Sequence, residues 1–274
     1  MAVTIIGIIL IIIGVACIFM KKSSQKRIMA LSLTDTYTAA KLIELQKTIS
    51  SEMGSSGSFR QLAEVRGKIE CPSPLSAEIS KEKCAYYISD VDIEYEETYY
   101  EEDHQSKRQV LKTRRASENI TRVERATNFY VKDETGKIKI NPEGADIDLI
   151  TSIERFEPAG NVNYSSGAVS FGGFSFSVNS NYMREGRKVL GYKFSEQIFP
   201  LNRDVFVIGE VSDSMGELTI SKPAADNESV FVISNKSEEQ LAKEAKSSAQ
   251  TLDIVSKICF AVGAIMAIAG FFVK

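Results

Sequence analysis

The sequence predicts an α+β membrane protein in which two transmembrane helices flank one mostly antiparallel β domain with helical stalks. Two apolar runs, at residues 2–20 and 258–273, contain no charged residue and predict the helices. The segments between them alternate large and polar side chains and are rich in Tyr, Val and Ile, which predicts strands. With 274 residues and a formal net charge of -3, the chain can bury a sizeable core and has no basic field for nucleic acid.

The first apolar run is about 28 Å long as a helix, enough to cross a bilayer. A cleaved signal peptide would carry a basic residue before this run and a small-x-small cleavage site after it. The sequence has neither, and Met20 is followed by Lys21 and Lys22. We therefore expect an uncleaved anchor.

The second apolar run is shorter, but Ile254 and Val255 can lengthen it while the Lys257 side chain extends to the headgroups. The alternative, a buried core helix, fits less well because the run is apolar on every side and follows a polar amphipathic stretch. Two spans in a lipid bilayer are therefore expected.

Basic residues predict the orientation of these spans. Those on the side of the central domain are Lys21, Lys22, Lys26, Arg27, Lys243, Lys246 and Lys257. Only Lys274 and the amino terminus lie on the other side. In a bacterial or archaeal plasma membrane, the positive-inside rule places the β domain in the cytoplasm and both termini outside. An organelle membrane can break this rule.

The chain divides into five segments: a first span at 2–20, a basic flank and amphipathic helix at 21–58, a β-rich domain at 59–235, a helical stalk at 236–257 and a second span at 258–273. Thr34 and Asp35 offer a cap for a helix over 35–52. Ser237 and Gln240 form a capping-box pattern, which predicts a helix running from there into the second span.

Seven segments of the middle region are expected to contribute to six to nine strands, and the turn from Asp133 to Gly136 joins two of them. They read CAYYISDVDIEYEETYY, NFYVKD, GKIKINP, GYKFSEQIFP, DVFVIGEV, LTIS and VFVIS.

The acidic stretch at 94–103 is followed by a basic stretch at 107–115. If they pair as a hairpin about residues 103–106, acids face bases across the strands, contributing ~0.2–1 kcal/mol per pair. Such a hairpin can be a solvated arm that discourages edge aggregation or a charged docking surface. A calcium site has little support because no D-x-D-x-D-G spacing occurs.

No catalytic residue, metal ligand or cofactor is predicted. His104 is the only histidine and lies at the expected hairpin turn. A zinc site of the H-E-x-x-H type is therefore impossible, and nothing positions His104 against a cysteine. The sequence also lacks G-x-x-x-x-G-K-[ST] and G-x-S-x-G, so nucleotide hydrolysis and ordinary hydrolase chemistry have no support.

Four cysteines divide into two pairs. Cys17 and Cys259 lie in the spans, where cysteine is usually a small apolar filler. Cys71 and Cys84 are two ligands short of a structural zinc site. Buried free thiols, a disulfide in an oxidising compartment, and a metal or redox function remain the alternatives.

The segment NYSSGAVSFGGFSFSVNSNY, at 163–182, places Phe171, Phe174 and Phe176 among glycines and serines. These residues are candidate contacts with a partner or with the membrane surface. The alternative is a set of core or edge strands.

The order of several motifs resembles that of the GIDE domain, also called the BAM (beside a membrane) domain. They are SPLS (Ser73, Pro74, Leu75, Ser76), CAYY (Cys84 to Tyr87), FYVKDETGKIKINPEGADID (with Asp133, Gly136 and Pro142), GYKFSEQIFPLNRDVFVIGEV (with Gly191, Tyr192, Gly209 and Glu210) and VFVIS, between two spans. This domain is the membrane-embedded part of RING-type ubiquitin ligases of mitochondrial and chloroplast outer membranes. RING-less relatives occur in bacteria and archaea.

In those ligases catalysis belongs to a RING, whose zinc ions need a cross-brace of Cys and His ligands. Outside its predicted spans this sequence has only Cys71, Cys84 and His104. The resemblance therefore implies a RING-less prokaryotic relative, a binding or scaffold domain that faces an unknown protein partner or the membrane surface. The alternatives are a ligase-family member whose RING is supplied elsewhere, and an organiser that self-associates through Gly263 and Gly270 of the second span.

Overall fold

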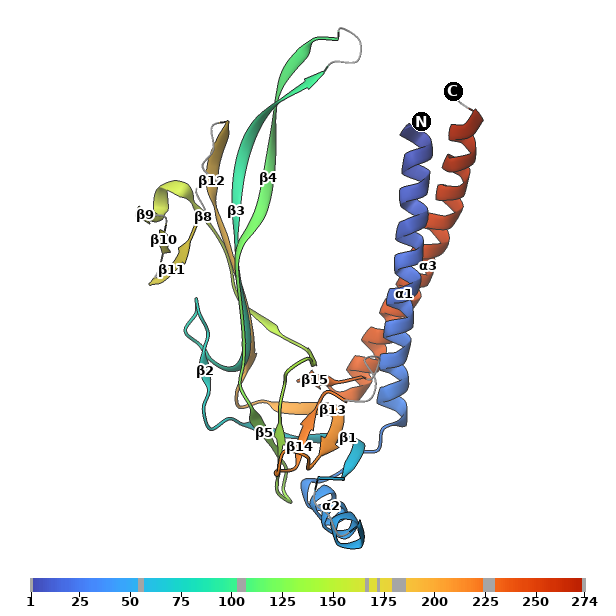
Figure 1. The fold of residues 1–274 in the computed structure, drawn as a ribbon, viewed down its shortest axis with the longest axis vertical. Coiled ribbons are helices and arrows are strands. Elements are labelled where there is room, and N and C mark those ends of the chain that lie inside the picture. Colours follow the sequence, from blue (N-terminus) through green and yellow to red (C-terminus); the bar gives the residue numbers. More distant parts are fainter. Residues whose placement is uncertain are drawn as a thin grey trace.

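The computed structural model describes residues 2–53, 57–102, 107–165, 168–171, 173–178, 186–223 and 230–272. Two long helices, α1 (Ala2–Leu33) and α3 (Glu238–Phe272), lie side by side, and a mostly antiparallel β domain stands beside them (Figure 1). A third helix, α2 (Ala39–Met53), lies at the end of the molecule away from both chain termini. The predicted fold class is confirmed.

A closed ring of strands forms the base of the β domain. The strands are β1 (Arg60–Glu70), β5 (Phe129–Lys132), β6 (Lys137–Ile140), β14 (Thr219–Ser221) and β13 (Asp204–Ser212), in that order, and β13 pairs back with β1. Within this ring β6 and β14 are parallel and the other pairs are antiparallel. This connectivity is that of an OB-type Greek-key barrel. Two short parallel strands, β7 (Asp146–Ile147) and β15 (Val232–Ser234), extend the sheet beyond β13.

Gly67 allows β1 to bend between its two partners, β13 and β5. A Cβ atom at this position would lie 2.3 Å from the carbonyl oxygen of Lys132. Only glycine permits so close an approach of two backbones without displacement.

Helix α2 closes one end of the barrel by burying Ala39 and Leu42 against the barrel core. Thr38 caps its amino terminus, accepting a hydrogen bond from the Lys41 N–H at 3.3 Å, and the Asp133 carboxylate accepts one from the Ala39 N–H at 2.8 Å. The helix therefore begins at Ala39, and the prediction of a cap at Thr34 and Asp35 is wrong. The first N–H groups of α2 are bonded by Thr38 and by Asp133 of the β5–β6 turn, which is distant in the sequence.

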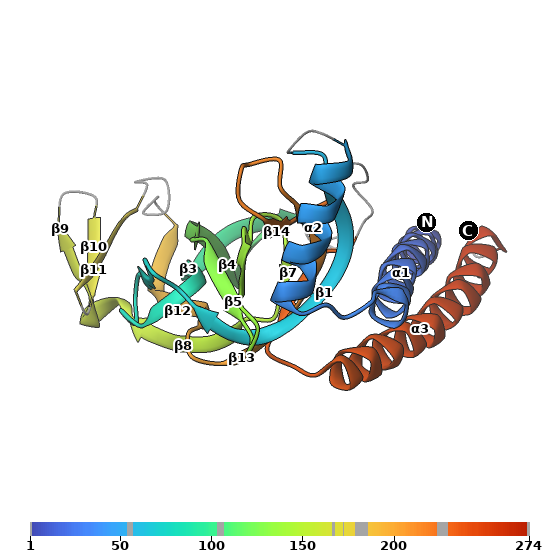
Figure 2. The same ribbon diagram turned by 90° about the horizontal axis from the view of Figure 1, so that it is seen from below.

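A second sheet lies beside the barrel, on the side away from α1 and α3 (Figure 2). It contains β4 (Gln109–Ala126), β3 (Lys83–Glu102), β12 (Arg187–Pro200) and β8 (Ile150–Pro158) in that order, with β2 (Leu75–Ser76) also paired to β3. After the short helix η1 (Ala159–Asn161), three small strands form a separate sheet: β9 (Asn163–Ser165), β10 (Ala168–Phe171) and β11 (Phe174–Ser177). The fifteen described strands exceed the six to nine expected, since several are only two to four residues long.

The long hairpin, β3 and β4, has the charge pairing that the sequence predicts. Glu96 faces Arg115 and Glu97 faces Arg114, with Nε to Oε1 distances of 3.2 Å and 2.6 Å. The expected turn at 103–106, with His104, lies outside the described residues.

The two long helices approach each other closely at glycines. A Cβ atom on Gly7 would lie 2.6 Å from the backbone nitrogen of Ala267, and one on Gly263 would lie 2.9 Å from the Gly7 carbonyl oxygen. Both helices are long and apolar enough to cross a membrane, and residues such as Ile12 and Ile265 are exposed on their outer faces. This arrangement fits a membrane protein whose two spanning helices pack against each other as an antiparallel pair.

Candidate functional site

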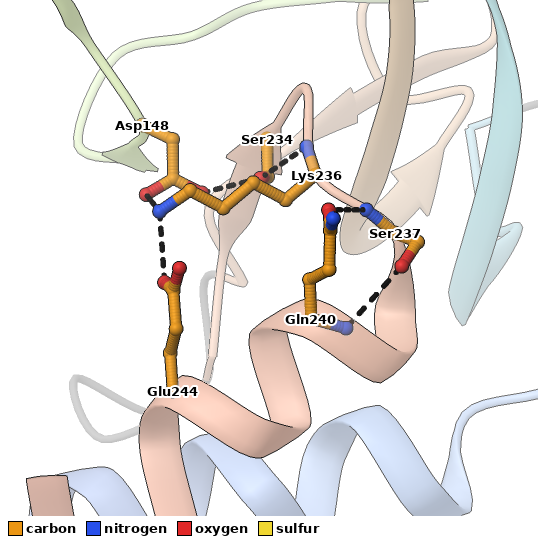
Figure 3. Close-up of polar contacts among 6 residues, drawn as sticks. All are labelled: Asp148, Ser234, Lys236, Ser237, Gln240 and Glu244. Atoms are coloured by element: carbon orange, nitrogen blue, oxygen red, sulfur yellow. Dashed lines mark hydrogen bonds and ion pairs between the residues drawn. The ribbon is translucent and has the colours of Figure 1, made fainter. Parts of the chain in front are cut away.

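The junction between the barrel and α3 is built by the capping box that the sequence predicts (Figure 3). The Ser237 N–H donates to Gln240 Oε1 at 3.1 Å, and the Gln240 N–H donates to Ser237 Oγ at 3.2 Å. Two backbone donors at the helix start are thereby satisfied.

Lys236 ties α3 to the barrel at the same place. Its Nζ lies 2.8 Å from Glu244 Oε2 and 3.6 Å from Asp148 Oδ1, and Ser234 Oγ donates to the Asp148 carboxylate (Figure 3). The hydrogen bond to Glu244 raises the pKa of Lys236. This ion pair joins the stalk to the strand region and is modest in strength because it is partly exposed.

Apolar packing strengthens the junction. Leu241, in the second turn of α3, is buried against Phe206 and Ile208 on the outside of β13. Helix α3 is thus fixed to the barrel by a cap, an ion pair and a buried leucine.

A groove of about 810 Å³ opens beside this junction. Its lining combines four basic residues, three acidic ones and an apolar floor: Arg66, Gly67, Lys68, Lys132, Asp133, Glu134, Asp204, Val205, Phe206, Asn235, Lys236 and Ser237. Arg66 stacks over Phe206 with 5.4 Å between the guanidinium carbon and the ring centroid, and its Nε lies 2.7 Å from buried Glu64. Mixed charge over an apolar floor suits a polypeptide segment better than a polyanion.

Residues of the SPLS and CAYY motifs form the corner where the chain enters β3. Leu75 lies opposite Cys84, and the Ser76 hydroxyl donates to the Lys81 carbonyl oxygen at 3.1 Å. Ser73 accepts a hydrogen bond from the Thr127 hydroxyl through its carbonyl oxygen at 3.4 Å. Pro74 lies between these contacts, and Tyr87 and Cys84 are buried together in a small cluster.

The Asp133 motif organises a turn and a helix end. Asp133 Oδ1 accepts hydrogen bonds from the N–H groups of Thr135 at 2.7 Å and Gly136 at 2.9 Å. Burial acts to raise the pKa of Asp133, but these bonds and the one from Ala39 lower it overall. Pro142 begins the next turn, and its carbonyl oxygen accepts from the Ala145 N–H at 3.1 Å.

Two motif glycines lie where any side chain would collide. A Cβ atom on Gly191 would lie 2.3 Å from the Glu157 carbonyl oxygen, and one on Gly209 would lie 2.7 Å from the Phe231 ring. Tyr192 is buried in the apolar cluster between the second sheet and the three small strands. The Glu210 carboxylate lies 3.9 Å from the Arg60 guanidinium across the β1–β13 pair. These positions therefore have roles in packing and strand pairing.

Phe174 and Phe176 lie in the core under the three small strands. They are 5% and 6% exposed, and the Phe176 ring contacts Tyr192 and Phe194 edge to face. The Phe171 backbone belongs to β10, and its side chain lies outside the described part of the structure. Contact of this segment with a membrane or a partner stays a prediction, and it would require these two rings to leave the core.

All four cysteines are free thiols. Burial raises the pKa of Cys84 to about 11 and also raises the pKa of Cys71, which makes both poor nucleophiles. Among the described residues, no three His, Cys, Asp or Glu side chains are grouped so as to hold a metal ion.

Sequence reasoning missed the buried carboxylates, and Glu196 is the most completely buried of those described. It is 0% exposed and accepts hydrogen bonds from the N–H groups of Ile79 at 2.7 Å and Ser80 at 2.9 Å, and from the Ser89 hydroxyl at 2.7 Å. Glu196 alternates along β12 with Tyr192, Phe194 and Ile198, so the sequence pattern could have predicted that its side chain faces the core.

Similarity to known proteins agrees with this architecture. A family model described as "GIDE: E3 Ubiquitin ligase" matches residues 97–269, more than half of the chain, from the outer part of β3 to the end region of α3. No curated protein and no solved structure gives a significant match. The chain therefore belongs to the GIDE family, and its β domain is a ligase-related domain carried by two membrane-type helices.

Proposed function

We propose that this chain is a membrane-anchored binding module of the GIDE family that presents its β domain to a protein partner, its 274 residues not supplying the Cys and His ligands of a RING. The observation that carries the proposal is the groove of about 810 Å³ at the junction of barrel and stalk. A groove of this size accommodates a few side chains of a bound segment.

The walls of the groove are held in place relative to each other, which supports this role. One wall comes from β1 and β13 of the barrel, and another comes from Lys236 and Ser237 at the start of α3. Because the cap, the ion pair and Leu241 hold α3 against the barrel, the groove is already formed before a partner arrives. A preformed site loses less conformational entropy on binding.

Two sheet edges offer a further mode of recognition. Among the described strands, β4 pairs with β3 and β8 pairs with β12, so each leaves one edge of the second sheet open. A partner strand added there would gain main-chain hydrogen bonds. The charges along β4 would select among partners and discourage indiscriminate pairing.

The family model's description favours a second candidate function. A ligase-family member can act through a RING supplied by another chain, with this domain as the adaptor. Self-association through Gly263 and Gly270 is less favoured, because α1 of the same chain already packs against both glycines. It stays a prediction, and it would require another face of α3.

Site-specific photo-crosslinking tests the proposed role. A photo-reactive amino acid at Lys68, exposed at the groove, should give one discrete adduct with another protein in cells. The matched control is Lys47, which is exposed on α2 away from the groove. The same adduct from both positions, or none from Lys68, would argue against the groove as the binding site.

A thioester-discharge assay separates the two candidates. Purified full-length protein should not accelerate release of ubiquitin-like modifier from a charged conjugating enzyme. If it does so alone, the adaptor role without a RING is wrong.

A further inference from the structure

Near its outer end, within the described residues, the long hairpin carries exposed apolar side chains, which we call the tip patch. It consists of Tyr99, Tyr100, Val110 and Leu111, which are 36%, 70%, 41% and 57% exposed. Tyr100 lies directly opposite Leu111, so these two side chains share one face of the hairpin, while Tyr99 and Val110 lie on the other face, opposite Lys112 and Glu101.

The hairpin and the apolar helices rise from the barrel in the same direction. Figure 1 shows the outer end of β3 and β4 at the same end of the molecule as both chain termini. At its base, β3 leaves the barrel core at Ala85 and Tyr86. Helix α1 leaves it just before Thr36, which bridges to Glu64 of β1.

The reach of the hairpin exceeds the height of the stalk. From Tyr86 to Glu102, β3 extends roughly 53 Å. The part of α1 between its apolar run and its end, residues 21–33, is only about 20 Å long. When α1 crosses a bilayer, the hairpin therefore reaches the lipid unless it is inclined from the helix axis by more than roughly 70°.

The charged side chains of the hairpin make its insertion into the hydrocarbon core of the bilayer unfavourable. Glu96, Glu97, Arg114 and Arg115 lie on its outer half, and such groups are costly inside a bilayer. An open two-stranded ribbon would also leave backbone groups unsatisfied there. The hairpin must therefore incline by at least this angle, and near the limiting angle its end lies at the membrane surface.

The composition of the tip patch suits that position. Tyrosine is favoured at the interface, where its ring meets apolar chains and its hydroxyl meets water. Lys107 and Arg108, both exposed beside the patch, can extend to lipid phosphates. Glu101, whose carboxylate lies 2.8 Å from Lys112 Nζ, shares the face of Tyr99 and Val110, and Glu102 follows Tyr100 on its face, so the apolar and charged groups meet at the boundary that headgroups occupy.

We infer that the tip patch lies in the headgroup layer of the bilayer that α1 and α3 cross, as a third point of membrane attachment independent of any protein partner. Relative to the arrangement in Figure 1, the helix pair and the hairpin spread apart when the protein enters a membrane.

Tryptophan fluorescence tests this inference, because the chain contains no tryptophan. Full-length Tyr100→Trp is reconstituted into vesicles of phosphatidylcholine and phosphatidylglycerol brominated either near the headgroup or at the chain ends. Met215→Trp is the matched control, since Met215 is 67% exposed in the β13–β14 turn. Both substitutions are at exposed positions, and circular dichroism checks that the strand content is unchanged.

The expected result is blue-shifted emission from Tyr100→Trp and strongest quenching by lipids brominated near the headgroup, with neither effect for Met215→Trp. Adding Leu111→Glu should abolish the shift and the quenching. Emission from Tyr100→Trp that matches the control would overturn the inference, and so would strongest quenching by lipids brominated at the chain ends.

Discussion

Single buried groups hold together loops that lie far apart in the sequence, and Glu196 is the clearest case. Its carboxylate, on β12, receives three hydrogen bonds from residues 79, 80 and 89, and thereby fixes the loop that leads into β3. Burial acts to raise the pKa of Glu196, but the hydrogen bonds outweigh it and leave the pKa lowered.

We expect Glu196→Gln to lower the free energy of unfolding by about 1–3 kcal/mol at neutral pH, because the amide NH₂ group faces donors. Since the folded-state pKa is below the unfolded value, the carboxylate's contribution is present above that unfolded value and is lost as pH falls through the folded pKa. The difference between wild type and variant should therefore shrink at acid pH. Urea unfolding in detergent at several pH values measures it, and Glu154→Gln, exposed on β8, is the control.

Backbone approach at glycine is the second constraint at this scale. We expect Gly191→Ala to destabilise the protein by about 1–3 kcal/mol, because its Cβ would lie 2.3 Å from the Glu157 carbonyl oxygen. Gly160→Ala should change little, since no atom lies within 4 Å of its Cβ position. Equal thermal denaturation midpoints for the two variants would contradict this explanation.

Among the elements, those with strong local patterns could be predicted, and those defined by distant partners could not. The capping box at Ser237 and the acid–base register of the long hairpin are local signals, and both are confirmed. The first strand of the barrel, β1, was missed because RQLAEVRGKIE shows no clean alternation and buries Glu64, whose partners Thr36 and Arg66 emerge only in the fold. The hydrogen bond from the Ala39 N–H of α2 to Asp133 was missed because these two residues are 94 positions apart.

The pairing of α1 with α3 depends on their close backbone contact. We expect Gly263→Leu to weaken this pairing by about 1–3 kcal/mol, because the added side chain meets the Gly7 backbone. Ala264→Leu, on the exposed face of the same helix, should be tolerated. Titration with dodecyl sulfate, followed by circular dichroism, measures the effect. Equal loss of helical structure in both variants would exclude glycine-mediated packing as the reason.

At the scale of the whole molecule, the side of the membrane that the β domain faces decides which partners it meets. Cys84 is an unsuitable reporter, because it is 0% exposed and its pKa is raised to about 11 by burial. Ser117→Cys, exposed on β4, is accessible instead. With the positive-inside orientation, an impermeant maleimide should label Ser117→Cys only after cells are opened. Labelling of intact cells above the wild-type level would reverse the orientation.

Closure of the barrel has a consequence for the order of events during synthesis. Val65 of β1 pairs with Val207 of β13, so the first strand of the barrel is made long before its partner. At ribosomal rates of about 5–20 residues per second, the edge of β1 that pairs with β13 waits on the order of ten seconds without its partner strand. Helix α1 waits longer still for α3, alone in the membrane. We therefore expect the unfinished chain, more than the mature protein, to depend on chaperones.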